Sequence, residues 1–271
     1  MGFLDYFKET LSNCINRDAE KWIEENYQDV SIDKILKVQF SIRLAALAYY
    51  SNHFACLDSV SLEKNKNDFS KLLPEKMIGT ELDKSSMISL LKRFEIFDFE
   101  AIRDDRTGSD AILIFAKDKP VDNVEGKTYA IVTVCGTFEL QDVWQDIKIS
   151  QVQFEETEAR AHSGFYECFQ ALKPGVESFL DKTVAEKTVD EILIVGHSLG
   201  GAVASLLGAS LAPKYEGENF RVVSVGAPKI GNKALQDLFK ERVKKHVRVR
   251  LTSDLIVRMP NLLYWFRKAF F

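Results

Sequence analysis

Cysteine is scarce in this 271-residue sequence, and the cysteines show no paired motif. The four of them lie far apart along the chain, and none belongs to a C-x-x-C pair: Cys14, Cys56, Cys135 and Cys168. A disulfide framework or a cysteine-ligated metal site would need close, paired spacing. We therefore expect reduced cysteines rather than disulfides or a metal site.

Long apolar runs and an excess of basic residues are missing as well. No stretch reaches the roughly 18 uncharged apolar residues of a membrane span. The opening MGFLDYFKET carries acids where a secretory signal has a basic flank, and Tyr6 stands where N-myristoylation requires Ser or Thr. A cytoplasmic protein is therefore expected. The net charge of -4 provides no basic field, which argues against a nucleic-acid partner.

Hydrophobic residues make up 46% of the chain, which is enough for one large α/β core. Residues 1–30 are predicted to form a helical N-terminal extension, and residues 31–271 one domain. Strands are expected at 93–102, 110–118 and 127–137. Beyond residue 160, helices and strands should alternate, with helices at 162–184, 198–212 and 232–243 and strands at 190–195, 220–228 and 246–251. This alternation predicts a mostly parallel central sheet with helices on both faces.

The strand predicted at residues 190–195 leads directly into GHSLG, and an apolar helical segment follows. Ser198 therefore stands at the apex of a strand, a sharp turn and a helix, the arrangement known as a nucleophile elbow. The motif needs its glycines because a side chain at Gly196 or Gly200 would collide with the neighbouring strand or helix. A serine hydroxyl becomes a strong nucleophile only when a base, normally a histidine oriented by a carboxylate, removes its proton.

Five motifs in order resemble the class 3 (fungal-type) lipase family. VGHSLGGAVASLLG is preceded by VCGTFELQDVWQD and HSGF, and it is followed by SVGAPKIGN and SDLIVRMP. The resemblance covers roughly residues 36–260. It implies an α/β-hydrolase fold and hydrolysis of acyl esters of glycerolipids or similar lipids, without a cofactor. The family usually has an arginine where this sequence has Cys135, a departure that we interpret as structural.

The resemblance also implies roles for individual residues. Ser198 falls on the family's nucleophile and Asp254 on its triad acid, while the backbone N–H groups of Thr137 and Leu199 correspond to the oxyanion hole. Residues 138–149 correspond to the lid, and its candidate lipid-facing residues are Phe138, Leu140, Val143 and Trp144.

Histidine is the residue whose scarcity matters most for this chemistry. The family's catalytic histidine follows the triad acid, and no histidine follows Asp254 in this sequence. His197 is expected to pack beneath the nucleophile. His246 opens a strand, which places it about 20 Å from the rim of the sheet where the acid belongs, and His53 is expected to be solvated or to cap a helix. His162 is the remaining candidate for a substitute base.

Two functions stay open at this point. The first is a serine ester hydrolase that acts on acylglycerols or related lipid esters through an acyl-serine intermediate. The second is a catalytically impaired lipase-like protein that binds lipid or a protein partner. The aromatic run NLLYWFRKAFF at 261–271 either packs into the core or, together with the lid, contacts a lipid surface transiently.

Overall fold

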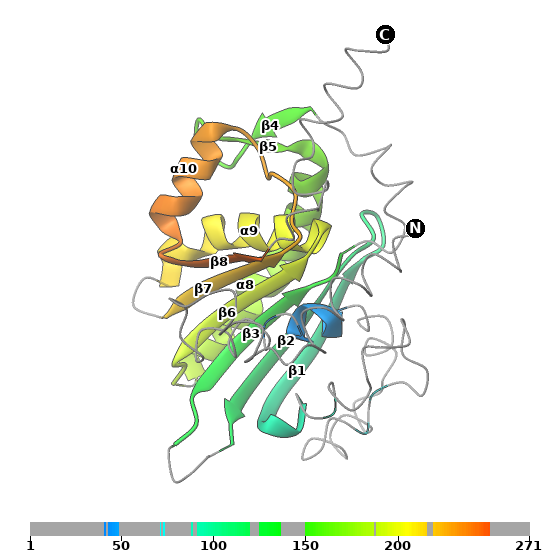
Figure 1. The fold of residues 1–271 in the computed structure, drawn as a ribbon, viewed down its shortest axis with the longest axis vertical. Coiled ribbons are helices and arrows are strands. Elements are labelled where there is room, and N and C mark those ends of the chain that lie inside the picture. Colours follow the sequence, from blue (N-terminus) through cyan, green and yellow to red (C-terminus); the bar gives the residue numbers. More distant parts are fainter. Residues whose placement is uncertain are drawn as a thin grey trace, which may run out of the picture.

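The computed structural model describes residues 41, 43–48, 71, 73, 88, 91–119, 125–136, 150–186, 188–215 and 219–249. Their centre is a six-stranded sheet with the strand order β1-β2-β3-β6-β7-β8 (Figure 1). The strands of this sheet are β1 (Phe94–Asp104), β2 (Ser109–Asp118), β3 (Thr128–Val134), β6 (Glu191–His197), β7 (Phe220–Val225) and β8 (Lys245–Val249). Each of them was predicted from its apolar run, with ends that differ by a few residues.

The sheet is mixed rather than uniform. β1, β2 and β3 pair antiparallel, whereas β3, β6, β7 and β8 pair parallel. The parallel strands end at a common edge, because Val134 of β3 pairs with Gly196 of β6, and His197 of β6 pairs with Val225 of β7. Connecting loops therefore meet at this edge, which is where ligands bind in open α/β sheets.

Helices and helical residues cover both faces of the sheet, as predicted. One face packs against α8 (Ser163–Glu186), α9 (Leu199–Leu211) and α10 (Lys233–Arg242). The other face packs against the helical residues 44–48, and Thr133 Oγ1 donates a hydrogen bond of 2.6 Å to the Leu44 carbonyl there. β6 is buried at all seven positions, since it has covered faces and a strand on each side. In the part of the chain described here, every helix is too short or too polar to span a bilayer.

A small hairpin precedes α8 and was not predicted. It consists of β4 (Gln151–Gln153) and β5 (Arg160–His162), which pair antiparallel beside the sheet. Strands of three residues are too short to show a clear alternation of apolar and polar side chains. The hairpin is held by tertiary contacts instead, including a bridge from Ala161 to Gly231 and a bond of 2.8 Å between the hydroxyls of Ser150 and Ser163.

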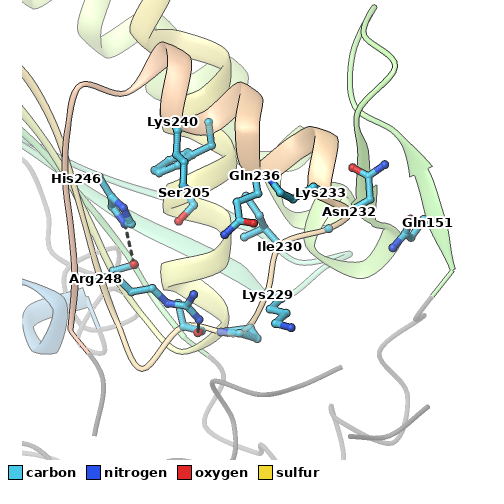
Figure 2. Close-up of a pocket in the computed structure, with 15 residues that line it drawn as sticks. Gln151, Ser205, Lys229, Ile230, Asn232, Lys233, Gln236, Lys240, His246 and Arg248 are labelled. Atoms are coloured by element: carbon cyan, nitrogen blue, oxygen red, sulfur yellow. Dashed lines mark hydrogen bonds between the residues drawn. The ribbon is translucent and has the colours of Figure 1, made fainter. Parts of the chain in front are cut away.

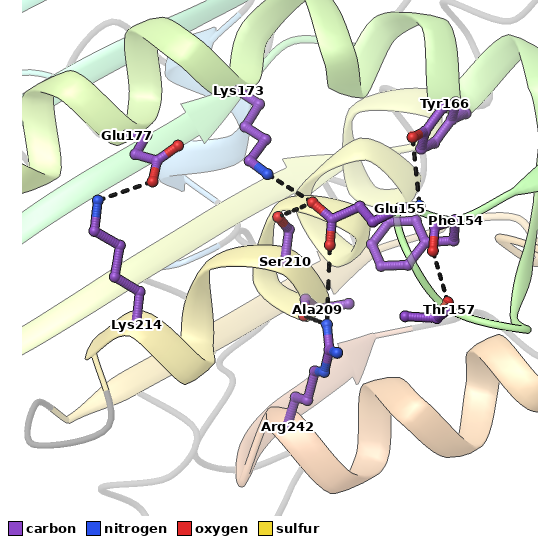
Figure 3. A network of polar contacts seen from close by, with 10 residues as sticks. All are labelled: Phe154, Glu155, Thr157, Tyr166, Lys173, Glu177, Ala209, Ser210, Lys214 and Arg242. Carbon is purple, nitrogen blue, oxygen red and sulfur yellow. Dashed lines mark hydrogen bonds and ion pairs between the residues drawn. The ribbon is translucent and has the colours of Figure 1, made fainter.

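Glu155, in the turn of this hairpin, connects the turn to three helices (Figure 3). Its Oε1 accepts hydrogen bonds of 2.6 Å from Lys173 Nζ of α8 and from Ser210 Oγ of α9. Its Oε2 lies 3.9 Å from Arg242 Nη1 of α10. The backbone of Glu155 has a φ of 50°, which L-residues rarely adopt. Through these contacts the carboxylate attaches the turn of the hairpin to the helical layer.

Replacing Glu155 with glutamine is expected to lower the free energy of unfolding by about 1–2 kcal/mol, because Lys173 and Ser210 lose a charged acceptor. Urea denaturation followed by circular dichroism measures the change. Lys214→Gln is the matched control: Lys214 forms ion pairs with Glu177 and Asp181 on the exposed surface, where such pairs contribute little. Equal losses of stability in the two variants would contradict the role given to Glu155.

Candidate functional site

Ser198 occupies a strained position between β6 and α9. Its backbone has φ 54° and ψ -123°, and its N–H donates a hydrogen bond of 2.9 Å to the Val225 carbonyl. A positive φ is costly for a residue with a side chain and persists where the surrounding structure enforces it. Here the bond to β7 and the start of α9 enforce it, so the serine projects from a rigid apex as the elbow motif predicts.

The glycines around Ser198 leave no room for side chains. A Cβ at Gly196 would lie 2.2 Å from the carbonyl oxygen of Gly200 in α9. A Cβ at Gly200 would lie 2.4 Å from the carbonyl oxygen of Val134 and 2.6 Å from that of Cys135. The expectation that side chains at these two positions would collide with helix and strand is therefore confirmed, and the turn depends on glycine at both.

The Ser198 side chain is buried and has no hydrogen-bond partner among the described residues. The residue is 1% exposed, and among the described residues Oγ has neither a donor nor an acceptor within reach. A buried hydroxyl left in this state costs about 1–3 kcal/mol. Native proteins retain such groups mainly where chemistry requires them. A hydroxyl that has no partner among the described residues is suited to receive a base and an electrophile.

The N-terminus of α9 provides a donor beside this hydroxyl. Leu199 is the first residue of the helix, so its N–H has no acceptor within the helix and lies at the positive end of the helix dipole. A group in this position can stabilise an oxyanion, and this role of Leu199 stays a prediction. Residues 137–149 and 250–271 lie outside the described part of the chain, so the roles predicted for Thr137, Asp254 and the lid stay predictions.

The described histidines differ in their surroundings, and none of them is hydrogen-bonded to Ser198 Oγ. His197 is 3% exposed, and burial lowers its pKa to about 3. His246 pairs with Val222 in the sheet, level with Ile194 of β6, and so it is offset from Ser198 by about 13 Å along the strand direction alone, at 3.3 Å per residue. This register supports the expectation that His246 lies away from the rim.

Two further contacts of these histidines bear on their roles. His246 Nε2 lies 3.2 Å from Ser224 Oγ, a contact that depends on strand register and that the sequence did not reveal. His162 ends β5, and its backbone N–H donates to the Ile230 carbonyl at 3.0 Å while its ring lies edge-on to Phe165. Catalytic hydrogen bonds often form only in the substrate complex. The role of His162 as a substitute base therefore stays a prediction.

Burial of His197 predicts a loss of stability in acid. Its folded pKa of about 3 lies below the ordinary 6.5, so the unfolded chain binds more protons between these pH values. The stabilisation is complete above pH 6.5 and is lost as the pH falls, by about 2 kcal/mol between pH 7 and pH 5. Urea denaturation at both pH values should show a smaller difference for His197→Gln than for the native chain. If the free energy of unfolding falls as much between pH 7 and pH 5 in His197→Gln as in the native chain, burial of His197 is not the cause of the loss.

The described cysteines agree with the expectation of reduced thiols. The thiols of Cys135 and Cys168 are buried and form no disulfide within the described ranges, and Cys135 Sγ contacts the Gly136 carbonyl oxygen at 3.0 Å. Burial raises the pKa of the Cys168 thiol. Within the described ranges, no three His, Cys, Asp or Glu side chains gather as ligands of a metal ion would.

A comparison with protein-family models identifies residues 131–264 as Lipase (class 3). The matched segment begins within β3 and contains the elbow at Ser198 and the position of Asp254. This part of the chain, just under half of it, is similar to the class 3 lipase family. The family resemblance expected from the five motifs is therefore confirmed.

Relatives and solved structures agree with this similarity to class 3 lipases. The chain is 26% identical over 106 residues to a secreted mono- and diacylglycerol lipase of Fusarium solani, a segment that covers 39% of this chain and 31% of that protein. It resembles a solved triacylglycerol lipase whose catalytic centre is described as a serine protease triad, with a TM-score of 0.63 at 15% identity over 87% of this chain and 77% of that one. A mutant lipase structure from Penicillium cyclopium gives a TM-score of 0.64 at 18% identity, with the same coverage. These structures confirm the α/β-hydrolase fold.

Proposed function

We propose that this protein hydrolyses carboxylic esters of acylglycerols or related lipids through an acyl-serine at Ser198. The observation that carries the proposal is the Ser198 hydroxyl, which is buried at a strained apex and has no hydrogen-bond partner in the described part of the chain. The N–H of Leu199 lies in the same turn and has no acceptor within α9. The relative from Fusarium solani, named a mono- and diacylglycerol lipase, supports acylglycerols as the substrate class.

The proposed reaction proceeds in two steps. Ser198 Oγ attacks the acyl carbonyl as a base takes its proton, and the resulting oxyanion accepts hydrogen bonds from the N–H groups of Leu199 and Thr137. Collapse of this tetrahedral species breaks the ester bond, and the base returns the proton to the departing glyceride oxygen. Water then attacks the acyl-serine in the same way, releasing the fatty acid and restoring the hydroxyl.

Each step requires a base beside Ser198. In this proposal Asp254 orients an imidazole, as in the family's triad, and His162 is the candidate imidazole among the described residues. Lipid esters are the proposed partners, and transient contact with a lipid surface is assigned to the lid residues or the aromatic run at 261–271. The non-catalytic alternative finds no support in the comparisons, whose relatives include proteins named as lipases and a phospholipase.

Labelling with a fluorophosphonate tests whether Ser198 reacts as a nucleophile. The probe should add once to the native chain, and peptide mass spectrometry should place it on Ser198. Ser205→Ala is a matched control, because Ser205 lies on the same helix with its hydroxyl bonded to the Gly201 carbonyl at 2.8 Å. This variant should label normally, whereas Ser198→Ala should not. Labelling at another residue, or none in the native chain, would overturn the proposal.

A further inference from the structure

A cavity of about 590 Å³ lies on the face of the sheet that α9 and α10 cover (Figure 2). Its walls come from α9, α10, β8, the end of β7 and the loop that follows β7. Ser198 is not among the residues that line it. The volume falls within the range of about 300–1,000 Å³ that small-molecule sites occupy. The cavity is therefore large enough for an organic ligand and is separate from the proposed nucleophile.

The charge of the lining is positive. Four of the fifteen described residues around the cavity are basic, and none of these fifteen is acidic: the basic ones are Lys229, Lys233, Lys240 and Arg248. The chain as a whole carries a net charge of -4, so this lining departs from the average surface. A cleft lined by one sign of charge focuses its field and concentrates ligands of the opposite sign.

Two of these cations are not neutralised by the residues that the structure describes. Lys233 pairs with Asp237, one turn further along α10, and Arg248 Nη2 donates to the Ala227 carbonyl at 2.8 Å. The ammonium groups of Lys229, on the loop, and Lys240, on α10, make no ion pair or hydrogen bond within the described ranges. An anion in the cavity would give both ammonium groups a partner.

Uncharged groups of the lining supply further donors. Asn232 caps α10, and its Oδ1 accepts from the backbone N–H groups of Leu235 and Arg160, which leaves its Nδ2 group to donate elsewhere. The same cap places the positive end of a ten-residue helix beside the cavity. The Ser224 and His246 pair adds polar atoms at 3.2 Å from each other on the sheet side.

We propose that this cavity binds a small organic phosphate, with Lys229 and Lys240 as its principal charged contacts and Arg248 and Asn232 as further donors. A phosphate group combines high negative charge with several strong acceptor oxygens, and lysine ammonium groups and a planar guanidinium suit these oxygens. The volume leaves room for an organic portion beside the phosphate. A soluble phosphate ester and the headgroup of an anionic lipid both present this chemistry.

Calorimetric titration of the full chain with glycerol 3-phosphate tests the site, with glycerol as the uncharged probe. We expect saturable binding at one site with a Kd below about 1 mM, and no binding of glycerol. The double variant Lys229→Gln/Lys240→Gln should weaken binding at least about 10-fold. Lys92→Gln/Lys244→Gln removes the same charge from exposed positions outside the cavity and should bind as the native chain does.

The outcomes separate the proposal from its alternatives. Absence of saturable binding, binding of glycerol as well, or an equal loss in both double variants would overturn it. Sedimentation with phosphatidylcholine vesicles that do or do not contain phosphatidic acid then identifies the source of the phosphate. Binding to the phosphatidic acid vesicles that depends on Lys229 and Lys240 supports a lipid headgroup, and binding of glycerol 3-phosphate alone supports a soluble ester. Neither measurement depends on ester hydrolysis, so the result for the cavity is independent of the role proposed for Ser198.

Discussion

Replacing Ser198 with alanine is expected to lower kcat for p-nitrophenyl butyrate between about 10³- and 10⁶-fold. The reason is the loss of the only atom that the elbow offers for covalent attack, while the Leu199 N–H and the fold remain in place. The variant should also be at least as stable as the native chain, because the buried hydroxyl without a partner is removed. Steady-state kinetics and urea denaturation measure the two effects.

The His162→Ala variant distinguishes which group acts as the base. If His162 removes the proton of Ser198, its replacement should reduce kcat about as strongly as Ser198→Ala. The reason is that the losses of rate caused by replacing members of one catalytic unit are not additive. A native rate in His162→Ala, with activity still abolished in Ser198→Ala, would assign the base to another residue. Equal rates in the native chain and in Ser198→Ala would contradict the proposed acyl-serine itself.

Gly200→Ala is expected to cost about 3 kcal/mol or more of folding free energy and to abolish activity. The new methyl group would lie 2.4 Å and 2.6 Å from the carbonyl oxygens of Val134 and Cys135. Both are backbone atoms at the end of β3, so neither can move aside without displacing the strand. α9 would have to shift instead, and Ser198 and Leu199 would shift with it.

Gly175→Ala is the matched control for this prediction. Gly175 lies inside α8, where the nearest atoms to a Cβ would all belong to the Ile102 side chain, with Cδ1 the nearest at 3.2 Å and Cγ2 next at 3.4 Å. That methyl group ends a flexible side chain, and alanine is favoured over glycine in a helix by about 1 kcal/mol. We expect a stability within about 1 kcal/mol of the native chain and full activity. Similar losses in the two glycine variants, measured by urea denaturation, would contradict the crowding at Gly200.

The regular part of the fold could be predicted because its signals are local. β6 contains a continuous apolar run at 192–195 that leads into Gly196, and α9 follows with helical spacing, so strand, turn and helix are all visible in sequence. The β4-β5 hairpin could not be predicted in this way, because contacts to distant residues hold it. Glu155 and Ser210, for example, lie 55 positions apart in the chain and 2.6 Å apart in space.

The candidate site likewise has features that follow from local sequence and features that depend on long-range packing. The GHSLG motif predicted Ser198 as the nucleophile and Leu199 as an oxyanion donor, because the backbone of one turn places both groups. The absence of a hydrogen-bond partner for Ser198 Oγ among the described residues could not be predicted, since it depends on how every neighbouring element packs. The contact between His246 and Ser224 likewise follows from the register of β8 against β7.

By itself, the sequence determined the family resemblance, the position of the elbow serine and the order of the main strands and helices. Apolar periodicity and the steric needs of a tight turn act over a few neighbouring residues, so they can be recognised without coordinates. Only the tertiary structure decided that Lys229, Lys240 and Arg248 line one cavity. The distances between these side chains depend on sheet register and on the packing of α10 over β7 and β8. Both bring together segments from different parts of the chain, and their spacing in the sequence does not indicate how close they lie in space.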